Sequence, residues 1–307
     1  MQQIHLPSNA IPLQNTQQKN RISARWLVPF AVGVVLTLWA SSFAGIAIGL
    51  QGYSPAQLAF LRYLVASIAL LANAIVTRMP LPHWRDWPGI FVLGAIGFSL
   101  YNVALNAGQQ TVSAGVAGFI ISAEIGVIAI LAAVFFKERL SRMGWLGVLI
   151  SLIGVALISF AGETEVHVSG GALLVMVATV CVGLYSILQK SYLKKYSALQ
   201  FTTYAIWAGT LCLLPAAPEA FQAISTAPTS ATLAVIYMGL FPGAVGYVSW
   251  SYVLAHIPAA RAGSYLTIIP VIALVIAWVW LGEIPTWVAI GGGAVVLLGV
   301  VLISRAR

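Results

Sequence analysis

The sequence contains very little charge. Only 7% of its 307 residues are Asp, Glu, Lys or Arg, whereas about 25% is usual in a soluble domain, and 60% are hydrophobic. A soluble fold could not cover its surface with so few charged groups. This composition therefore excludes an ordinary water-soluble protein and predicts a chain whose main partner is the lipid bilayer.

Cysteine and catalytic motifs are also scarce. The two cysteines, Cys181 and Cys212, both lie in apolar stretches, which favours small buried residues over a disulfide or a metal site. The sequence has no G-x-x-x-x-G-K-[ST], G-x-S-x-G, H-E-x-x-H or C-x-x-C motif. We therefore expect no enzyme activity, no cofactor, no bound metal and no ATP-driven mechanism.

Long apolar stretches fill most of the chain. A spanning helix needs about 20 apolar residues, and backbone groups in hydrocarbon must be hydrogen-bonded internally, so each stretch is predicted to be a helix. Ten stretches qualify, roughly 27–50, 55–78, 88–109, 112–136, 141–160, 169–189, 197–214, 230–254, 258–281 and 285–304. The predicted fold class is an all-α membrane protein with ten transmembrane helices.

The basic residues all fall on one side of this ten-helix arrangement, apart from Arg62. They are Lys19, Arg21, Arg25, Arg78, Arg85, Lys137, Arg139, Arg142, Lys190, Lys194, Lys195, Arg261, Arg305 and Arg307. The opposite connections carry Glu163, Glu165, Glu219 and Glu283 but no Lys or Arg. The positive-inside rule therefore predicts a multi-pass membrane protein with both termini in the cytoplasm. This placement explains the net charge of +8 without nucleic acid as a partner.

One stretch of the chain is repeated. Several residues are identical to the residue 145 positions later, including the pairs Glu138 and Glu283, Gly147 and Gly292, and Gly154 and Gly299. Each copy closes one half of the chain, and five helices per half would invert the second half in the membrane. The predicted domains are a disordered cytoplasmic tail (1–26) and two inverted five-helix repeats (27–160 and 169–304).

Polar side chains within the spans are candidates for a substrate cavity, because polar groups in lipid usually face a cavity or a partner. Ser99, Asn102, Asn106 and Gln109 share one face of the third helix. Hydrogen bonds between helices, each worth about 0.6–2 kcal/mol, are the alternative explanation for that face. The full candidate cavity set is Trp39, Ser42, Ser99, Tyr101, Asn102, Asn106, Tyr185, Tyr247, Trp250 and Tyr265.

Two charges lie inside predicted spans. Arg62 is about two turns inside the second helix, and Glu124 is in the middle of the fourth. A lone charge at this depth costs at least about 2.5 kcal/mol, so each should have a partner or water. They could pair with each other, or Glu124 could titrate and couple transport to protons.

The motifs are similar to those of a known family. Trp39-Ala-Ser-Ser-Phe43 resembles the W-G-S-x-F signature in the first helix of EamA-type drug/metabolite transporters, and Pro270 with Leu281-Gly282-Glu283 resembles their helix 9–10 junction. The resemblance covers residues 27–304 and is strongest to the aromatic amino acid exporter branch. It implies an exporter of the cell inner membrane, built as a basket of ten helices with a central substrate cavity. It also suggests aromatic amino acids or related amphipathic metabolites as the cargo. Ile125, where a proline would match Pro270, and Val182-Gly183, where Trp-Ala is usual, depart from the pattern.

These observations predict a secondary transporter that exports aromatic amino acid-like solutes by alternating access. A proton-coupled multidrug antiporter that uses Glu124 is the alternative within transport. A channel or a membrane-embedded enzyme is the alternative from another class. Because one chain carries both repeats, a monomer should suffice.

Overall fold

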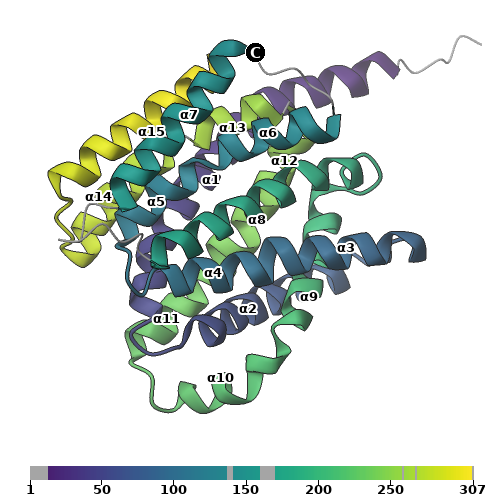
Figure 1. The fold of residues 1–307 in the computed structure, drawn as a ribbon. Helices are drawn as coiled ribbons and strands as arrows, with labels where there is room; N and C mark the ends of the chain where they lie inside the picture. Colours follow the sequence, from purple (N-terminus) through teal and green to yellow (C-terminus); the bar gives the residue numbers. More distant parts are fainter. Residues whose placement is uncertain (1–12, 137–140, 160–169, 258, 267, 306–307) are drawn as a thin grey trace, which may run out of the picture.

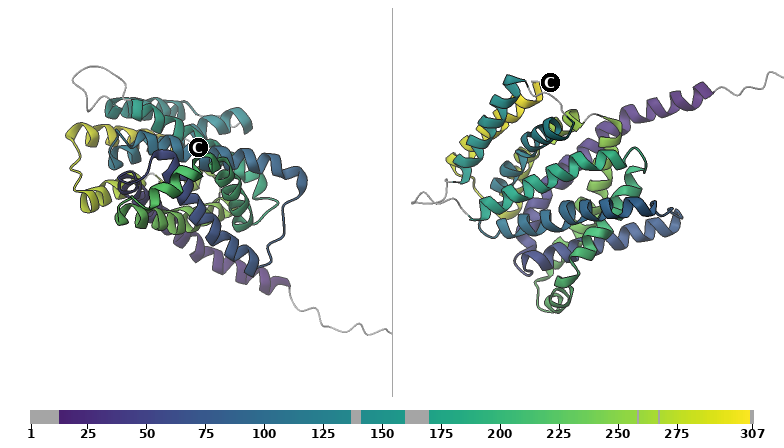
Figure 2. Two further views of the ribbon diagram at one scale, coloured as in Figure 1. Left: turned by 90° about the horizontal axis from the view of Figure 1, so that it is seen from below. Right: turned by 45° about the vertical axis from the view of Figure 1, so that its right-hand side comes forward.

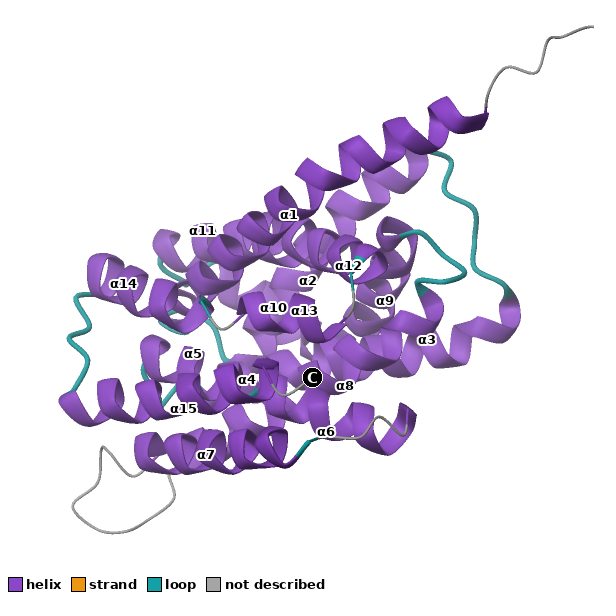
Figure 3. Cartoon of the chain, turned by 90° about the horizontal axis from the view of Figure 1, so that it is seen from above, coloured by secondary structure: helices purple, strands orange, loops and turns teal. Residues whose placement is uncertain are grey.

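The computed structural model describes residues 13–136, 141–159, 170–257, 259–266 and 268–305. All regular elements within these ranges are helices (Figures 1 and 3). The first half contains α1 Leu13–Gly49, α2 Pro55–Val76, α3 Trp87–Gly94, α4 Tyr101–Gly108, α5 Ala114–Ser122, α6 Glu124–Phe136 and α7 Arg142–Ser159. The second half contains α8 Gly170–Tyr192, α9 Ala198–Cys212, α10 Ala217–Ile224, α11 Thr229–Met238, α12 Tyr247–His256, α13 Ala259–Leu266, α14 Ile269–Leu281 and α15 Trp287–Arg305.

Local sequence signals set several helix ends. The Ser54 hydroxyl accepts the Gln57 N–H, and the Gln57 side chain accepts the Ser54 N–H, which forms a capping box at the start of α2. Ser197 and Gln200 form the same box at the start of α9. At the end of α14, Gly282 has a φ of 68°, a left-handed conformation that glycine adopts without a Cβ penalty.

Many helices are apolar enough to cross a bilayer. Five described stretches meet both length and composition requirements, namely Trp26–Gly49, Pro55–Val76, Trp84–Gly108, Gly170–Tyr192 and Thr229–His256. Shorter apolar helices occupy Ala114–Ile128, Arg142–Gly154, Ile269–Leu281 and Ile290–Leu302. Large apolar side chains, such as those of Trp278 and Val279, are exposed on their outer faces, where lipid would cover them. The chain is therefore a multi-pass membrane protein.

The helices follow the apolar ranges predicted from the sequence, with differences at the edges. α1 begins at Leu13, so residues 13–26, which composition assigns to a tail, continue the first helix. The short helix α10 lies in the predicted connection between residues 214 and 230 and packs its Phe221 ring edge-on against Phe60, with ring centroids 5.7 Å apart. Glu138 lies outside the described residues.

Two long helices contain a π-helical segment at matching positions. Residues 95–100 (η2) join α3 to α4, and residues 239–246 (η4) join α11 to α12. Adding 145 to the numbers of η2 gives 240–245, which falls inside η4. A π-helical turn widens the helix locally and is often found at functional sites. The segments directly after both turns carry Tyr101 and Tyr247.

Two further helices are interrupted at matching positions. α5 and α6 are separated by Ala123, and in the second half α13 ends at Leu266 while Ile268 forms a turn directly before α14. Ala123 and Ile268 are also 145 positions apart. Discontinuous helices at equivalent places in two halves commonly mark the binding site of a secondary transporter.

The repeated glycines bring α7 and α15 together. The two helices run side by side at one edge of the molecule (Figures 1 and 2). A Cβ on Gly154 would lie 2.8 Å from the Gly292 carbonyl oxygen, and a Cβ on Gly299 would lie 2.5 Å from the Gly147 carbonyl oxygen. The contact is thus reciprocal, because each helix offers the same pair of glycines to the other. Only a hydrogen atom fits at these positions.

Candidate functional site

A cavity lies where the interrupted helices meet α1, α2, α4, α8 and α12. Its lining combines aromatic, aliphatic and charged side chains from both halves of the chain. These residues are Trp39, Ser42, Phe43, Arg62, Tyr101, Leu105, Gly118, Ile121, Ser122, Glu124, Ile125, Val182, Tyr247, Leu266, Ile269 and Pro270. Ligand sites in proteins are commonly apolar pockets with a few well-placed polar groups, and this cavity has that character.

The helix break between α5 and α6 places polar groups in the cavity wall. Glu124 is the first residue of α6, and Ser122 is the last of α5. The Ser122 hydroxyl donates to the Phe119 carbonyl at 2.6 Å. The corresponding break in the second half brings Ile269 and Pro270 to the same cavity. The two breaks therefore differ chemically, because one presents a carboxylate and the other presents apolar side chains.

Arg62 approaches the cavity from α2 and is 3% exposed. One of its terminal nitrogens, Nη1, donates to the Asn102 Oδ1 at 3.0 Å. Asn102 in turn donates to the Tyr63 hydroxyl at 2.7 Å and to the Phe98 carbonyl at 3.0 Å. The Nε of Arg62 has no hydrogen-bond partner. The guanidinium is thus hydrogen-bonded through Nη1, while its Nε donor is left unsatisfied.

Glu124 is 4% exposed and is held from α8. The Ser186 hydroxyl donates to its Oε1 at 2.8 Å. Within the described part of the chain, Glu124 and Arg62 form no ion pair with each other, since each is held by a different neutral side chain. In this conformation the two charges therefore have separate partners, and their direct pairing, which the sequence allows, stays a prediction.

Aromatic rings gather at one side of the cavity. The Trp39 ring lies 5.0 Å from the Tyr247 ring and 5.5 Å from the Trp250 ring, measured between centroids. Trp250 is buried behind these rings and does not line the cavity. The indole nitrogens of both tryptophans are buried without a hydrogen-bond partner. Trp39 and Tyr247 therefore join the two halves of the chain at the cavity wall.

The polar face predicted on the third helix is buried, but it lies against neighbouring helices. The Ser99 hydroxyl donates to the Gly209 carbonyl at 2.7 Å, and the Asn106 amide donates to the Pro55 carbonyl at 3.0 Å. The Gln109 amide donates to the Phe43 carbonyl at 3.0 Å. These residues, like Asn102, do not line the cavity in this conformation. In this conformation they form hydrogen bonds between helices, which is the alternative explanation that the sequence leaves open for this polar face.

Two other candidate residues also lie away from the cavity lining. Tyr185 is fully buried against Phe98, with ring centroids 5.0 Å apart, and its hydroxyl has no partner. Tyr265 is 39% exposed. Of the sequence-predicted set, the cavity brings together Trp39, Ser42, Arg62, Tyr101, Glu124 and Tyr247. Their role in substrate binding stays a prediction.

Sequence reasoning missed several lining residues, including Phe43, Leu105 and Ser122. The sequence did carry one signal for the cavity wall, namely Ile125 in the place of the proline that would match Pro270. Both residues stand just after a helix break, and both line the cavity. No group of three or more metal-binding side chains is found among the described residues.

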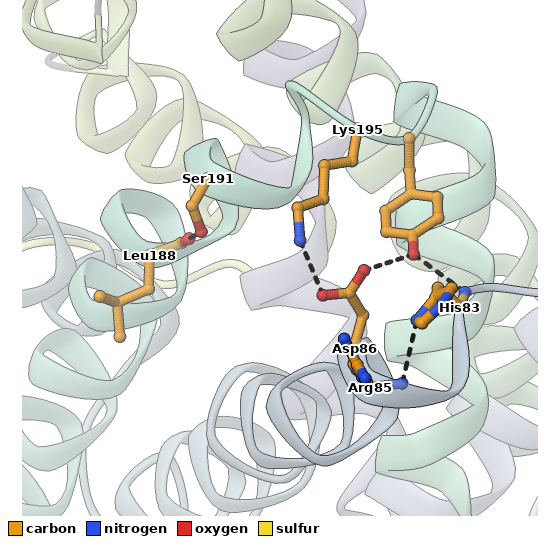
Figure 4. Close-up of polar contacts among 7 residues, drawn as sticks. His83, Arg85, Asp86, Leu188, Ser191 and Lys195 are labelled. Atoms are coloured by element: carbon orange, nitrogen blue, oxygen red, sulfur yellow. Dashed lines mark hydrogen bonds and ion pairs between the residues drawn. The ribbon is translucent and has the colours of Figure 1, made fainter.

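A polar cluster ties the two halves together at the end of the molecule where α3 begins (Figure 4). Asp86 accepts hydrogen bonds from the Lys195 ammonium at 2.9 Å and from the Tyr196 hydroxyl at 2.6 Å. The bond and charge of Asp86 raise the pKa of Lys195 above its usual value, and the same carboxylate raises the pKa of Tyr196. The Tyr196 hydroxyl also accepts the His83 N–H at 3.0 Å.

Comparison with known proteins shows the family to which the chain belongs. The model of the EamA-like transporter family matches residues 25–160 and, separately, residues 169–305. The chain belongs to the EamA-like transporter family. It carries the family unit twice, as the repeated glycines and matched helix breaks suggest.

Relatives of this EamA-like transporter are also transporters rather than enzymes. The uncharacterized transporter YdfC of Bacillus subtilis is 40% identical over 87% of both chains. A probable terminal-alkyne amino-acid exporter of Streptantibioticus cattleyicolor is 40% identical over 90% of this chain and 93% of its own. The uncharacterized inner membrane transporter YedA of Escherichia coli K12 is 24% identical over 92% of this chain and 93% of its own.

A solved crystal structure has the same fold. It superposes with a TM-score of 0.65 over 92% of this chain and 99% of its own, at 17% identity. At this identity the likeness concerns the fold alone. The family match and the named relatives make the chain a membrane transporter of small molecules.

Proposed function

We propose that the chain is a secondary transporter that exports aromatic amino acids or related amphipathic metabolites across the inner membrane. The observation that carries the proposal is the cavity itself, in which Trp39, Tyr101 and Tyr247 lie beside Arg62 and Glu124. Aromatic walls suit a planar apolar side chain, and charged groups suit the polar end of an amino acid. The relative named as a probable amino-acid exporter supports this class of substrate.

Alternating access would proceed in a ten-helix arrangement of two inverted repeats. The reciprocal packing of Gly154 and Gly299 supports a pseudo-twofold relation between the halves, as do the matched interruptions at Ala123 and Ile268. The helix breaks and π-helical turns would act as hinges around the cavity, because their backbone hydrogen bonds depart from the α-helical pattern. Rocking of the halves would open the cavity to each side in turn.

Inversion of the repeats has a direct test by cysteine labelling. Ser141 and Thr286 occupy equivalent positions 145 residues apart, and inversion places them on opposite membrane faces. In a background with Cys181 and Cys212 replaced by alanine, S141C should react only from the cytoplasm and T286C only from outside. Labelling of both from one face would reject the inverted topology and the predicted location of the termini.

Uptake into proteoliposomes tests the substrate. Labelled tryptophan and phenylalanine should enter with saturation, and alanine should enter far more slowly. Trp39→Ala should weaken apparent affinity for tryptophan about tenfold, which corresponds to about 1.4 kcal/mol of lost ring contact. Trp287→Ala is the matched control, since Trp287 is 88% exposed and does not line the cavity. Equal effects of the two changes would contradict the assignment of the cavity.

A proton-coupled antiporter is the second candidate, and one observation favours it. Glu124 is buried in the cavity with a serine as its hydrogen-bond partner and without an ion pair in the described chain. Such a carboxylate can take up and release a proton as its surroundings change. Uptake that requires an imposed pH gradient in the wild type, and loses that requirement in Glu124→Gln, would favour this candidate over a facilitator.

A further inference from the structure

The cavity holds two opposite charges that are kept apart. Arg62 is on α2 and Glu124 begins α6, and both line the same cavity. Asn102 holds Arg62, and Ser186 holds Glu124, in bonds of 3.0 and 2.8 Å. Two buried opposite charges attract strongly in a medium of low dielectric constant. In this structure, however, each is hydrogen-bonded to a different neutral side chain at the cavity wall.

Each charge retains unused hydrogen-bonding capacity. The Nε of Arg62 is buried and has no partner, while the described chain gives Glu124 a single hydrogen bond, to Oε1. A buried charge is costly unless it is paired and hydrogen-bonded. A ligand with one negative and one positive group would satisfy both side chains at once.

We propose that Arg62 and Glu124 form a clamp for a zwitterion, in which Arg62 binds the α-carboxylate and Glu124 binds the α-ammonium of an amino acid. A guanidinium binds a carboxylate through two parallel hydrogen bonds, and a carboxylate accepts the N–H groups of an ammonium. The inference rests on the proposed amino-acid transport and specifies how the same cavity would recognise its substrate.

The remaining lining residues define the third part of the ligand. Tyr101 and Tyr247 contribute aromatic side chains to the cavity lining, and Ile269 and Pro270 contribute aliphatic ones. An apolar or aromatic side chain would lie against this wall, while the two charged groups engage the clamp. Amines without a carboxylate and acids without an amine would each leave one buried charge unpaired, so they should be poor ligands.

The test is binding of three related ligands to the purified full chain. L-Tryptophan carries both charges, tryptamine lacks the carboxylate, and indole-3-propionate lacks the amine. Wild-type protein should bind each single-charge analogue at least about tenfold more weakly than tryptophan, as expected for the loss of one charge-assisted hydrogen-bonded contact. This comparison needs no variant and so does not depend on whether a mutant folds.

Two variants assign the charges. Arg62→Gln should weaken binding of tryptophan and indole-3-propionate at least about tenfold and leave tryptamine unchanged. Glu124→Gln should weaken binding of tryptophan and tryptamine and leave indole-3-propionate unchanged. Arg142→Gln and Glu219→Gln remove exposed charges outside the cavity lining and should leave all three affinities unchanged.

The outcomes separate this inference from the proposed function. If tryptophan is bound and transported but the analogues bind equally well, the clamp is wrong and amino-acid transport stands. If the same variant weakens both analogues alike, the assignment of the two charges is wrong. If the wild type neither binds nor transports any amino acid, the proposed function fails and the clamp fails with it.

Discussion

The contact between α7 and α15 gives a sharp prediction about stability. A methyl group on Gly154 would lie 2.5 Å from the Val296 backbone nitrogen and 2.8 Å from the Gly292 carbonyl oxygen. Both atoms belong to the facing backbone, so neither can turn aside, and the two helices would have to separate. Overpacking typically costs about 1–3 kcal/mol, and a clash with backbone atoms lies in the upper part of that range, at about 2–3 kcal/mol. Replacing a helical glycine by alanine returns about 1 kcal/mol, which leaves a net loss of about 1–2 kcal/mol for Gly154→Ala.

The neighbouring triplet of glycines provides a matched control. A Cβ on Gly291 would meet nothing within 4 Å, so Gly291→Ala gains helix propensity without a clash. The apparent melting temperature of the detergent-solubilised protein, followed by tryptophan fluorescence, measures both effects. Gly154→Ala should melt roughly 2–8 °C below the wild type, and Gly291→Ala should melt at or slightly above it.

Reciprocity of the contact adds a second test. A Cβ on Gly299 would lie 2.5 Å from both the Gly147 carbonyl oxygen and the Ser151 nitrogen, so Gly299→Ala should lower the melting temperature by a similar amount. The double variant should lower the melting temperature by less than the sum of the two single effects, because the first methyl group already separates the helices. If the Gly154→Ala and Gly291→Ala variants have the same melting temperature, the packing argument is refuted.

Three further predictions concern side-chain hydrogen bonds between segments distant in the sequence. Asn102→Leu removes the partner of Arg62 and should destabilise the protein by about 1–3 kcal/mol in the same melting assay, whereas Gln110→Leu at an exposed site should have little effect. Asp86→Asn weakens the bonds to Lys195 and Tyr196 and should accelerate amide hydrogen exchange in residues 83–89, and unchanged exchange would show that the cluster does not join the halves. Asp86 raises the pKa of Lys195 in the folded chain. The stability that this ion pair contributes should therefore be fully present below the pKa of an unfolded lysine, about 10.4, and be lost as the pH rises through the higher pKa of the folded state. The difference in melting temperature between wild type and Lys195→Gln should therefore shrink only in strongly alkaline solution.

Sequence analysis predicted an all-helical membrane protein, because length and hydropathy indicate which stretches can lie in lipid. Five described stretches meet the requirements for a spanning helix, and the count of ten stays a prediction. It also identified Gly147, Gly154, Gly292 and Gly299, since their spacing is repeated in the two halves. What these glycines touch was not predictable from the spacing. The reciprocal contact of α7 with α15 depends on how the halves pack in three dimensions.

The candidate site was predicted only in part. Periodicity places Ser99, Asn102 and Asn106 on one helix face, but it cannot distinguish a neighbouring backbone carbonyl from a cavity. In the same way, the sequence indicates that Arg62 and Glu124 need partners without naming them. The actual partners, Asn102 and Ser186, come from other helices that only the folded chain brings close.

The interruptions of the helices were the hardest features to predict. The π-helical turns at residues 95–100 and 239–246 carry no distinctive residue pattern beyond scattered glycines and Pro242. α10 was missed because its eight residues are too few for a spanning helix. These elements depend on tertiary packing, which overrides local propensity.

The most direct test of the central claim is exchange of tryptophan across a sealed membrane. Proteoliposomes loaded with unlabelled tryptophan are diluted into a trace of labelled tryptophan, and the label inside is followed with time. An alternating-access carrier with an aromatic-binding cavity should accumulate label transiently above its final level, and Trp39→Ala should reduce this overshoot while Trp287→Ala should not. Entry of label without any overshoot, unaffected by preloading, would contradict alternating access and favour a channel. Absence of tryptophan entry would contradict the proposed substrate.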